Sequence, residues 1–124
     1  MDQPIMNHSI STVYLKTDKG LSSFCIPDIM YFHIENDEVK ALQIDGQIDN
    51  VHHSLSELES MFTTFDFFRI HAKSLINLLH IKHYNHKICS VTLKNEKRLI
   101  VSQKRKTELY KLLSGKIPAL KTEI

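Results

Sequence analysis

Apolar and polar residues alternate along most of this chain, and β-branched side chains are frequent in the alternating stretches. A period of two residues is the pattern of a strand that buries one face. Two short polar turns, Asp18-Lys19-Gly20 and Asp45-Gly46, lie between such stretches and predict tight hairpins. The pattern therefore predicts a mainly β fold. The expected strands are residues 12–17, 21–26, 29–34, 39–44, 47–51, 67–71, 75–76, 80–84, 88–93 and 99–101.

Two segments have the period of a helix instead. Ser54 and Glu57 have the spacing of a capping box, and one apolar face follows them in a short central helix. A second helix is predicted between an N-cap at Ser102 and a stop at Gly115. The apolar positions are Leu55, Leu58 and Phe62 in the first helix and Leu109, Leu112 and Leu113 in the second.

Size and composition are those of an ordinary folded domain: 124 residues, 42% hydrophobic and 24% charged. We expect one domain over residues 1–113 and a loose tail over 114–124. No apolar run approaches the roughly 20 residues that span a bilayer, and no secretory signal opens the chain. We therefore expect a cytoplasmic location without membrane contact. Cys25 and Cys89 are too few for a disulfide framework and are expected to be reduced, half-buried strand residues.

Charge is divided by position along the chain. Residues 1–66 contain three Lys or Arg and eleven Asp or Glu, a formal −8, whereas residues 67–124 contain thirteen and three, a formal +10. The modest net charge of +2 hides this division. A strongly basic half favours a polyanionic partner. The alternative is a solvated surface whose cations pair with the acidic half after folding.

Two basic segments are candidates for contact with phosphate. Ser102-Gln103-Lys104-Arg105-Lys106 places three cations at the expected start of a helix, where positive charge is unfavourable unless an anion compensates it. His71-Ala72-Lys73-Ser74 has the composition of a loop that projects polar side chains from a sheet. Lys73 suits a phosphate or a guanine edge, and His71 suits a phosphate or a base. The alternatives are an exposed basic turn and a plain connection between strands.

Metal binding and catalysis are disfavoured. His80, His83 and His86 are spaced by three residues, but positions 80 and 83 of a strand point to opposite faces. The sequence has no glycine-rich phosphate loop and no nucleophile elbow, and it contains only three glycines. We therefore expect a binding protein rather than an enzyme, with no catalytic residue, metal site or cofactor.

The order of the motifs resembles a LytTR-type DNA-binding domain over about residues 28–113. The most distinctive stretch is Phe67-Phe68-Arg69-Ile70-His71, followed by Asn77 and His80-Ile81. Asp28-Ile29-Met30-Tyr31-Phe32, the capped segment 54–59 and Val101-Ser102 before a basic helix complete the match.

The resemblance implies an elongated stack of small antiparallel sheets with a short central helix and a C-terminal helix. Loops of such domains enter successive major grooves of duplex DNA. These domains are the output half of bacterial response regulators in two-component systems, regulate transcription and commonly bind direct repeats in promoters as dimers. The residues at the family's three contact loops are Asn36, Asp37 and Glu38 in the first, His71, Ala72 and Lys73 in the second, and Ser102, Gln103, Lys104 and Lys106 in the third.

Roles follow from the chemistry of these side chains. Arg69 and Asn77 are interpreted as structural hydrogen-bonding groups. The expected phosphate contacts are Lys73, Lys104, Arg105 and Lys106, and the expected base or sugar contacts are His71 and Gln103.

The first loop departs from this chemistry because Glu35, Asp37 and Glu38 place three carboxylates at a groove contact. Glu38 suits a cytosine amino group, but near phosphates a carboxylate more often repels. An alternative is therefore a LytTR-like protein-interaction module that regulates a partner and binds DNA weakly or not at all. Nothing before Asp28 is long enough for a receiver domain, so we expect a free-standing regulator, which Met1 favours, or a fragment of a longer one.

Overall fold

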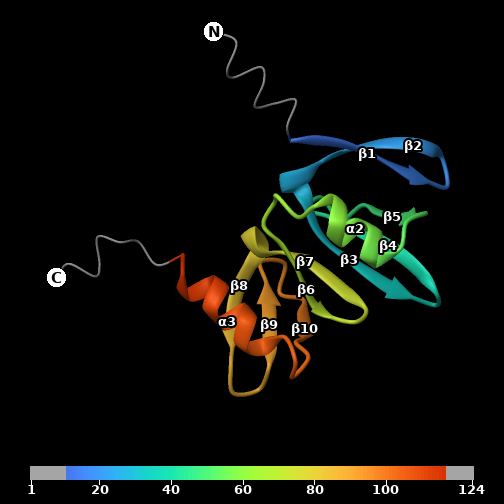
Figure 1. Cartoon of the computed structure of the whole chain (residues 1–124). Helices are drawn as coiled ribbons and strands as arrows, with labels where there is room; N and C mark the ends of the chain where they lie inside the picture. Colours follow the sequence, from blue (N-terminus) through green and yellow to red (C-terminus); the bar gives the residue numbers. More distant parts are fainter. Residues whose placement is uncertain (1–10, 117–124) are drawn as a thin grey trace, which may run out of the picture.

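The computed structural model describes residues 11–116, which form ten strands and two α-helices (Figure 1). The predicted mainly β class is confirmed. The strands are β1 (Thr12–Thr17), β2 (Gly20–Cys25), β3 (Ile29–Glu35), β4 (Glu38–Gln43), β5 (Ile48–Val51), β6 (Phe67–His71), β7 (Ser74–Asn77), β8 (Ile81–Asn85), β9 (Ser90–Leu93) and β10 (Arg98–Ile100). The helices are α2 (Leu55–Met61) and α3 (Lys106–Ser114), with 3-10 turns η1 (Ile26–Asp28) and η2 (Leu78–His80).

The strands form two antiparallel sheets. Seven lie in the order β2-β1-β5-β4-β3-β7-β6, and three lie in the order β10-β9-β8. Both hairpins predicted from polar turns are present, with Gly20 at φ 99° and Gly46 at φ 90°. Residues with a side chain rarely adopt such angles, which explains glycine at both positions.

Different elements cover the two faces of the seven-stranded sheet (Figure 1). Helix α2 covers one face, where Leu58 is fully buried in a core that includes Phe32. The three-stranded sheet and α3 cover the other, where Val91 and Leu109 are fully buried. Adjacent residues of β7 point to opposite cores, Leu75 to the first and Ile76 to the second. The domain is therefore a stack held by two cores that share one sheet.

Helix α2 begins as the sequence predicts. The Ser54 hydroxyl accepts from the Glu57 N–H, and the Glu57 carboxylate accepts from the Ser54 N–H, each at 3.0 Å. This capping box satisfies two backbone donors that no earlier helical turn can satisfy. The predicted apolar face is confirmed, because Leu55, Leu58 and Phe62 are all buried.

The predicted start of the second helix at Ser102 is wrong. Helix α3 begins at Lys106, and its N-cap is Arg105, which makes no side-chain capping bond. The Ser102 N–H donates to the Ile70 carbonyl at 2.8 Å, so the chain is still tied to β6 after it leaves β10. A turn must follow before a helix can form, and the Arg105 N–H closes that turn on the Ser102 carbonyl at 3.0 Å.

Three exposure predictions also need correction. Leu112 is 41% exposed, because α3 packs through Leu109 and Leu113 instead. Cys25 is exposed on the outer face of β2, and Cys89 is buried in the turn before β9, with φ 52°. Neither cysteine is therefore a half-buried strand residue, although both thiols are free as expected.

The first hairpin belongs to the large sheet. Thr17 pairs with Val51 of β5, and the His52 N–H donates to the Lys16 carbonyl at 2.8 Å. None of the helices within residues 11–116 is long and apolar enough to cross a membrane. Residues 1–10, and the part of the expected tail from 117 on, lie outside the described range.

Candidate nucleic-acid interface

Two predicted contact loops project from the same edge of the seven-stranded sheet. Strands β3 and β6 run in the same direction, because each pairs antiparallel with β7 between them. The turn after Glu35 and the turn after His71 are therefore neighbours. The Ile34 N–H donates to the Lys73 carbonyl at 2.9 Å and ties the two turns together.

The third segment reaches the same place from the other sheet. Its first residue, Ser102, is bonded to β6 at Ile70, directly before His71. A hollow of about 390 Å³ lies between the β6–β7 turn and this segment. Its walls therefore bring two predicted contact segments together, and its lining residues are Arg69, His71, Ala72, Ser102, Lys104 and Arg105.

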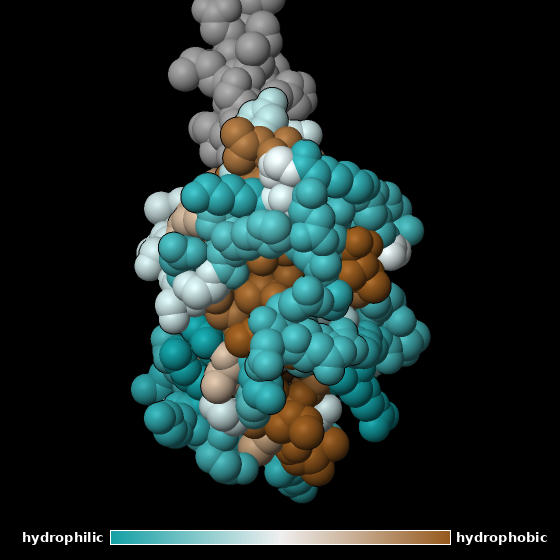
Figure 2. All heavy atoms as spheres, turned by 90° about the vertical axis from the view of Figure 1, so that its right-hand side faces the viewer, coloured by the Kyte–Doolittle hydropathy of each residue, from teal (hydrophilic) through white to brown (hydrophobic). Residues whose placement is uncertain are grey.

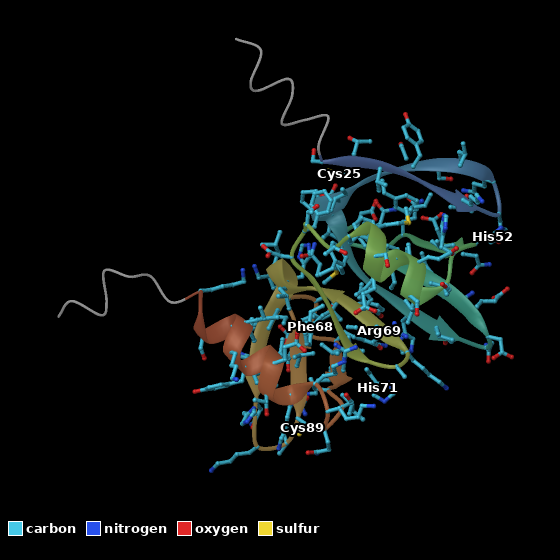
Figure 3. The ribbon with its side chains drawn as sticks, viewed as in Figure 1. Cys25, His52, Phe68, Arg69, His71 and Cys89 are labelled. Carbon is cyan, nitrogen blue, oxygen red and sulfur yellow. The ribbon has the colours of Figure 1, made fainter. Side chains whose placement is uncertain are left out.

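The β6–β7 turn is held in shape by an arginine beneath it. The Arg69 guanidinium donates to the His71 carbonyl at 3.1 Å and to the Ala72 carbonyl at 2.6 Å (Figure 3). On the neighbouring strand, the His33 ring bonds the Ser74 hydroxyl at 2.8 Å. Arg69 thus has the structural role expected for it, and its donors are used within the protein.

A backbone hydrogen bond determines which ring nitrogen of His71 can donate. The Lys73 N–H donates to His71 Nδ1 at 3.2 Å, so Nδ1 is an acceptor and Nε2 carries the hydrogen of the neutral ring. His71 is therefore equipped to donate to an acceptor such as guanine O6 or N7, or a phosphate oxygen. Ala72 offers only a methyl group, which leaves His71 and Lys73 as the polar side chains of this tip.

The cations of the third segment divide into free and paired side chains. Within residues 11–116, Lys104 and Lys106 form no ion pair, and neither does Lys73 of the neighbouring turn. Arg105 lies 4.0 Å from Glu59 and 3.8 Å from Glu108, and its guanidinium lies 5.8 Å from the centre of the Phe68 ring.

Gln103 is also partly committed, since its amide donates to the buried Cys89 thiol at 3.3 Å. Apart from the local pair of Arg105 with Glu108, these contacts join residues that are distant in the chain, and no local pattern predicts them. Three lysines thus remain available for an external anion.

The β3–β4 turn has the opposite charge. Asn36 and Asp37 occupy its two corner positions at φ 54° and 63°, in the left-handed region. Glu35 and Glu38 face each other as paired residues at the strand ends, and Glu38 also pairs with Lys40 at 3.2 Å. The predicted carboxylate cluster is therefore present at the tip, beside the basic turn.

His33 lies where these charges meet. Burial lowers the pKa of His33, Glu35 opposes this effect, and the positive charges of Lys97 and Lys73 lower the pKa further. The neutral ring that results suits its bond to the Ser74 hydroxyl. Lys97 comes from the β9–β10 turn, and it lines a small hollow together with His33 and Glu35.

The surface on this side is mainly hydrophilic. Figure 2 faces the side toward which the β3–β4 and β6–β7 turns point, and polar side chains cover most of it around separate apolar patches. No group of three or more metal-binding side chains gathers anywhere in residues 11–116. His80 instead bonds the Pro27 carbonyl at 2.6 Å, and His86 bonds the Tyr84 hydroxyl at 2.6 Å.

Basic turns at one edge of a mainly β domain favour a polyanionic ligand such as nucleic acid. The LytTr DNA-binding domain family matches residues 19–114. The chain therefore belongs to this family, whose general function is DNA binding in transcription regulation and not catalysis.

A solved structure supports this assignment. The chain is similar to the LytTr DNA-binding domain of a protein described as a methyl-accepting/DNA response regulator from Bacillus cereus. Sequence identity is 27% and the TM-score is 0.70, over 83% of this chain and 96% of that chain. Comparison with curated proteins gave no match.

Proposed function

We propose that this domain binds duplex DNA sequence-specifically through the turns at the edge of its large sheet, and that these turns enter successive major grooves. The β6–β7 turn and the segment from Ser102 to Lys106 are the main contacts. The observation that carries the proposal is the convergence of these two segments around one hollow, with Lys73, Lys104 and Lys106 free of ion pairs within the described residues.

Phosphate contacts provide most of the affinity in this proposal. Lys73, Lys104 and Lys106 neutralise backbone phosphates, and Arg105 joins them as far as its carboxylate partners allow. The Nε2 donor of His71 contacts a base or phosphate acceptor. Gln103 reaches a base or sugar only by leaving the Cys89 thiol, and Ser102 contributes its hydroxyl.

The acidic turn has a narrower role. Asn36, at its corner, carries an amide that suits an adenine edge, and Glu38 accepts from a cytosine amino group. Both contacts require the DNA to approach despite repulsion between the phosphates and the three carboxylates. We therefore propose that this turn restricts which sequences bind and adds little affinity.

The biological setting follows from the same proposal. The domain acts as a transcription regulator in the bacterial cytoplasm, and it binds promoter direct repeats, with one copy on each repeat and two copies forming a dimer on DNA. Sedimentation of the protein with duplexes that carry one or two selected sites tests this stoichiometry.

The salt dependence of DNA affinity is the primary test. If about four phosphates are neutralised, the logarithm of the association constant falls with the logarithm of salt concentration at a slope of roughly −3 to −4. The duplex is obtained by selection from a random oligonucleotide pool. A slope near zero for every duplex rejects the mechanism, and a steep slope without any enriched sequence rejects specificity alone.

One observation favours a second function. The carboxylates of Glu35, Asp37 and Glu38 lie beside the basic turn at the edge that would face DNA. If their repulsion prevents binding, the domain acts as an interaction module that regulates a protein partner. This candidate predicts no measurable DNA affinity in the unmodified domain and strong binding once the carboxylates are replaced by amides.

A further inference from the structure

Glu59, on α2, is the point at which the two basic segments share a partner. Its Oε1 accepts from Arg69 Nη1 at 3.2 Å, and its Oε2 lies 4.0 Å from Arg105 Nη2. One carboxylate therefore faces both guanidinium groups, with a different oxygen toward each.

Each arginine is linked directly to one DNA-contacting segment. Arg69 donates to the carbonyls of His71 and Ala72, so its position fixes the tip of the β6–β7 turn. Arg105 belongs to the other segment and lines the same hollow. A displacement of Glu59 would consequently be transmitted to both walls of the hollow.

The Arg69 half of this bridge is more than a surface ion pair. The Arg69 side chain is only 16% exposed, so its bond to Glu59 is partly shielded from solvent and from salt. Without the carboxylate, the like charges of Arg69 and Arg105 would repel each other across the hollow. Glu59 both attracts the two segments and cancels a repulsion that would separate them.

We infer that Glu59 is a positioning residue that sets the spacing between the β6–β7 turn and the Ser102–Arg105 turn. The inference rests on the proposed function, because that spacing matters when both segments contact one duplex. It also gives α2 a part in recognition without any contact between the helix and DNA.

Glu108→Gln is the matched control for Glu59→Gln. Glu108 lies 3.8 Å from the same Arg105, and each substitution removes one negative charge beside it. Among the described ion pairs, however, Glu108 has no link to Arg69. Differences between the two variants therefore report the bridge and not the change in net charge. Circular dichroism and thermal unfolding verify that both variants fold.

The first readout needs no DNA. Backbone ¹⁵N order parameters and amide chemical shifts are measured for residues 71–73 and 103–105 in the free protein. In Glu59→Gln we expect both segments to shift and to lose order, whereas Glu108→Gln should alter only the surroundings of Arg105. A response confined to one segment in Glu59→Gln, or the same response in both variants, would overturn the inference.

The second readout is the ratio of affinities for a selected duplex and a shuffled duplex of equal length. Loss of the bridge should lower this ratio by about fivefold in Glu59→Gln. The reason is that the two turns, once wrongly spaced, can no longer both make their contacts on the selected duplex. Glu108→Gln should raise both affinities by a similar factor of about two and leave the ratio unchanged.

The two failures are distinguishable. If selection enriches no sequence, the proposed specific function fails, and the order parameters still decide the role of Glu59. If selection succeeds but the ratio is the same in both variants, the positioning role is wrong and the proposed function stands. Glu59→Asp, which keeps the charge with a shorter reach, should retain part of the wild-type ratio.

Discussion

The β3–β4 turn and the β6–β7 turn leave the same sheet edge side by side, yet they differ in charge and in support. The first has three carboxylates and a two-residue corner of left-handed backbone. The second has His71 and Lys73, with both carbonyls of its tip held by Arg69. The position of a turn in the fold thus brings it to the proposed DNA interface, whereas its side chains decide whether it attracts or repels a polyanion.

The largest effect should come from removing the cations of the attractive side. Lys73→Gln with Lys104→Gln should weaken binding to any duplex by about 50-fold and reduce the magnitude of the salt slope by about 2. Fluorescence anisotropy over a salt series measures both quantities.

Lys87→Gln with Lys111→Gln is the control for this pair, because it removes the same charge from the β8–β9 turn and from α3. Equal losses in the two double variants would mean that net charge, and not the edge, determines affinity. A change in preference at one base pair in Lys104→Gln would instead assign that lysine to sequence reading.

A substitution at the opposite end of the large sheet from the turns should affect the stability of the fold. Asn77 is 1% exposed, donates to the Ile29 carbonyl at 2.9 Å and accepts from the Leu79 N–H at 3.0 Å. Asn77→Ala leaves both groups unpaired and should reduce the free energy of unfolding by about 2 kcal/mol. Thr107→Ala, at an exposed position of α3, should change it by less than about 0.5 kcal/mol.

Urea denaturation of the two variants measures these differences. DNA affinity of Asn77→Ala below its unfolding range should match the wild type, because the substitution is remote from the turns. A large loss of DNA affinity in the folded variant would show that packing in the core also determines the conformation of the DNA-contacting turns.

The repulsive turn should respond to removal of its charge. Asp37→Asn with Glu38→Gln should raise DNA affinity by about fivefold, since two carboxylates near the phosphates are neutralised. Asp45→Asn with Asp49→Asn makes the same change at the far end of the β4–β5 hairpin and should alter affinity less than twofold. An unchanged constant in the first variant would show that this turn stays outside the groove.

The smallest effect concerns His33, between the two turns. Its pKa is lowered, mainly by burial, so the unfolded chain binds a proton more readily than the folded domain. The stabilising contribution is present above the ordinary histidine pKa of about 6.5 and is lost as pH falls below it. Unfolding measured across this range should show a weaker pH dependence in His33→Gln than in the wild type. Bound DNA should raise the pKa of His33, as NMR titration can detect.

Local patterns gave the secondary structure where a single segment contains its own stabilising contacts. The capping box at Ser54 and Glu57 and the hairpin at Asp45-Gly46 are of this kind, and both are present. The start of α3 was missed because it depends on the bond from Ser102 to Ile70, which only the assembled sheets provide. The exposure of Cys25 likewise depends on which face of β2 the fold covers.

In the candidate site too, some features follow from the local sequence and others depend on tertiary contacts. The basic residues at 71–73 and 102–106 are visible in the sequence, and the resemblance to the family indicated their use. Their convergence on one hollow required the pairing of β3, β7 and β6 and the stacking of the second sheet. Neither Glu59 nor Lys97 has a local signal, because their partners are brought close only by tertiary contacts.

The left-handed corner at Asn36 and Asp37 limits how the first turn could diversify during evolution. Asn, Asp and Gly adopt such backbone angles most readily, whereas β-branched residues are strained there. Substitution of Asp37 by Asn or Gly would remove a negative charge at little conformational cost. Lys or Arg at either corner would adopt the left-handed backbone less readily than Asn or Asp does. Substitutions that make the first turn basic are therefore expected at positions 35 and 38, where the extended backbone accepts any side chain.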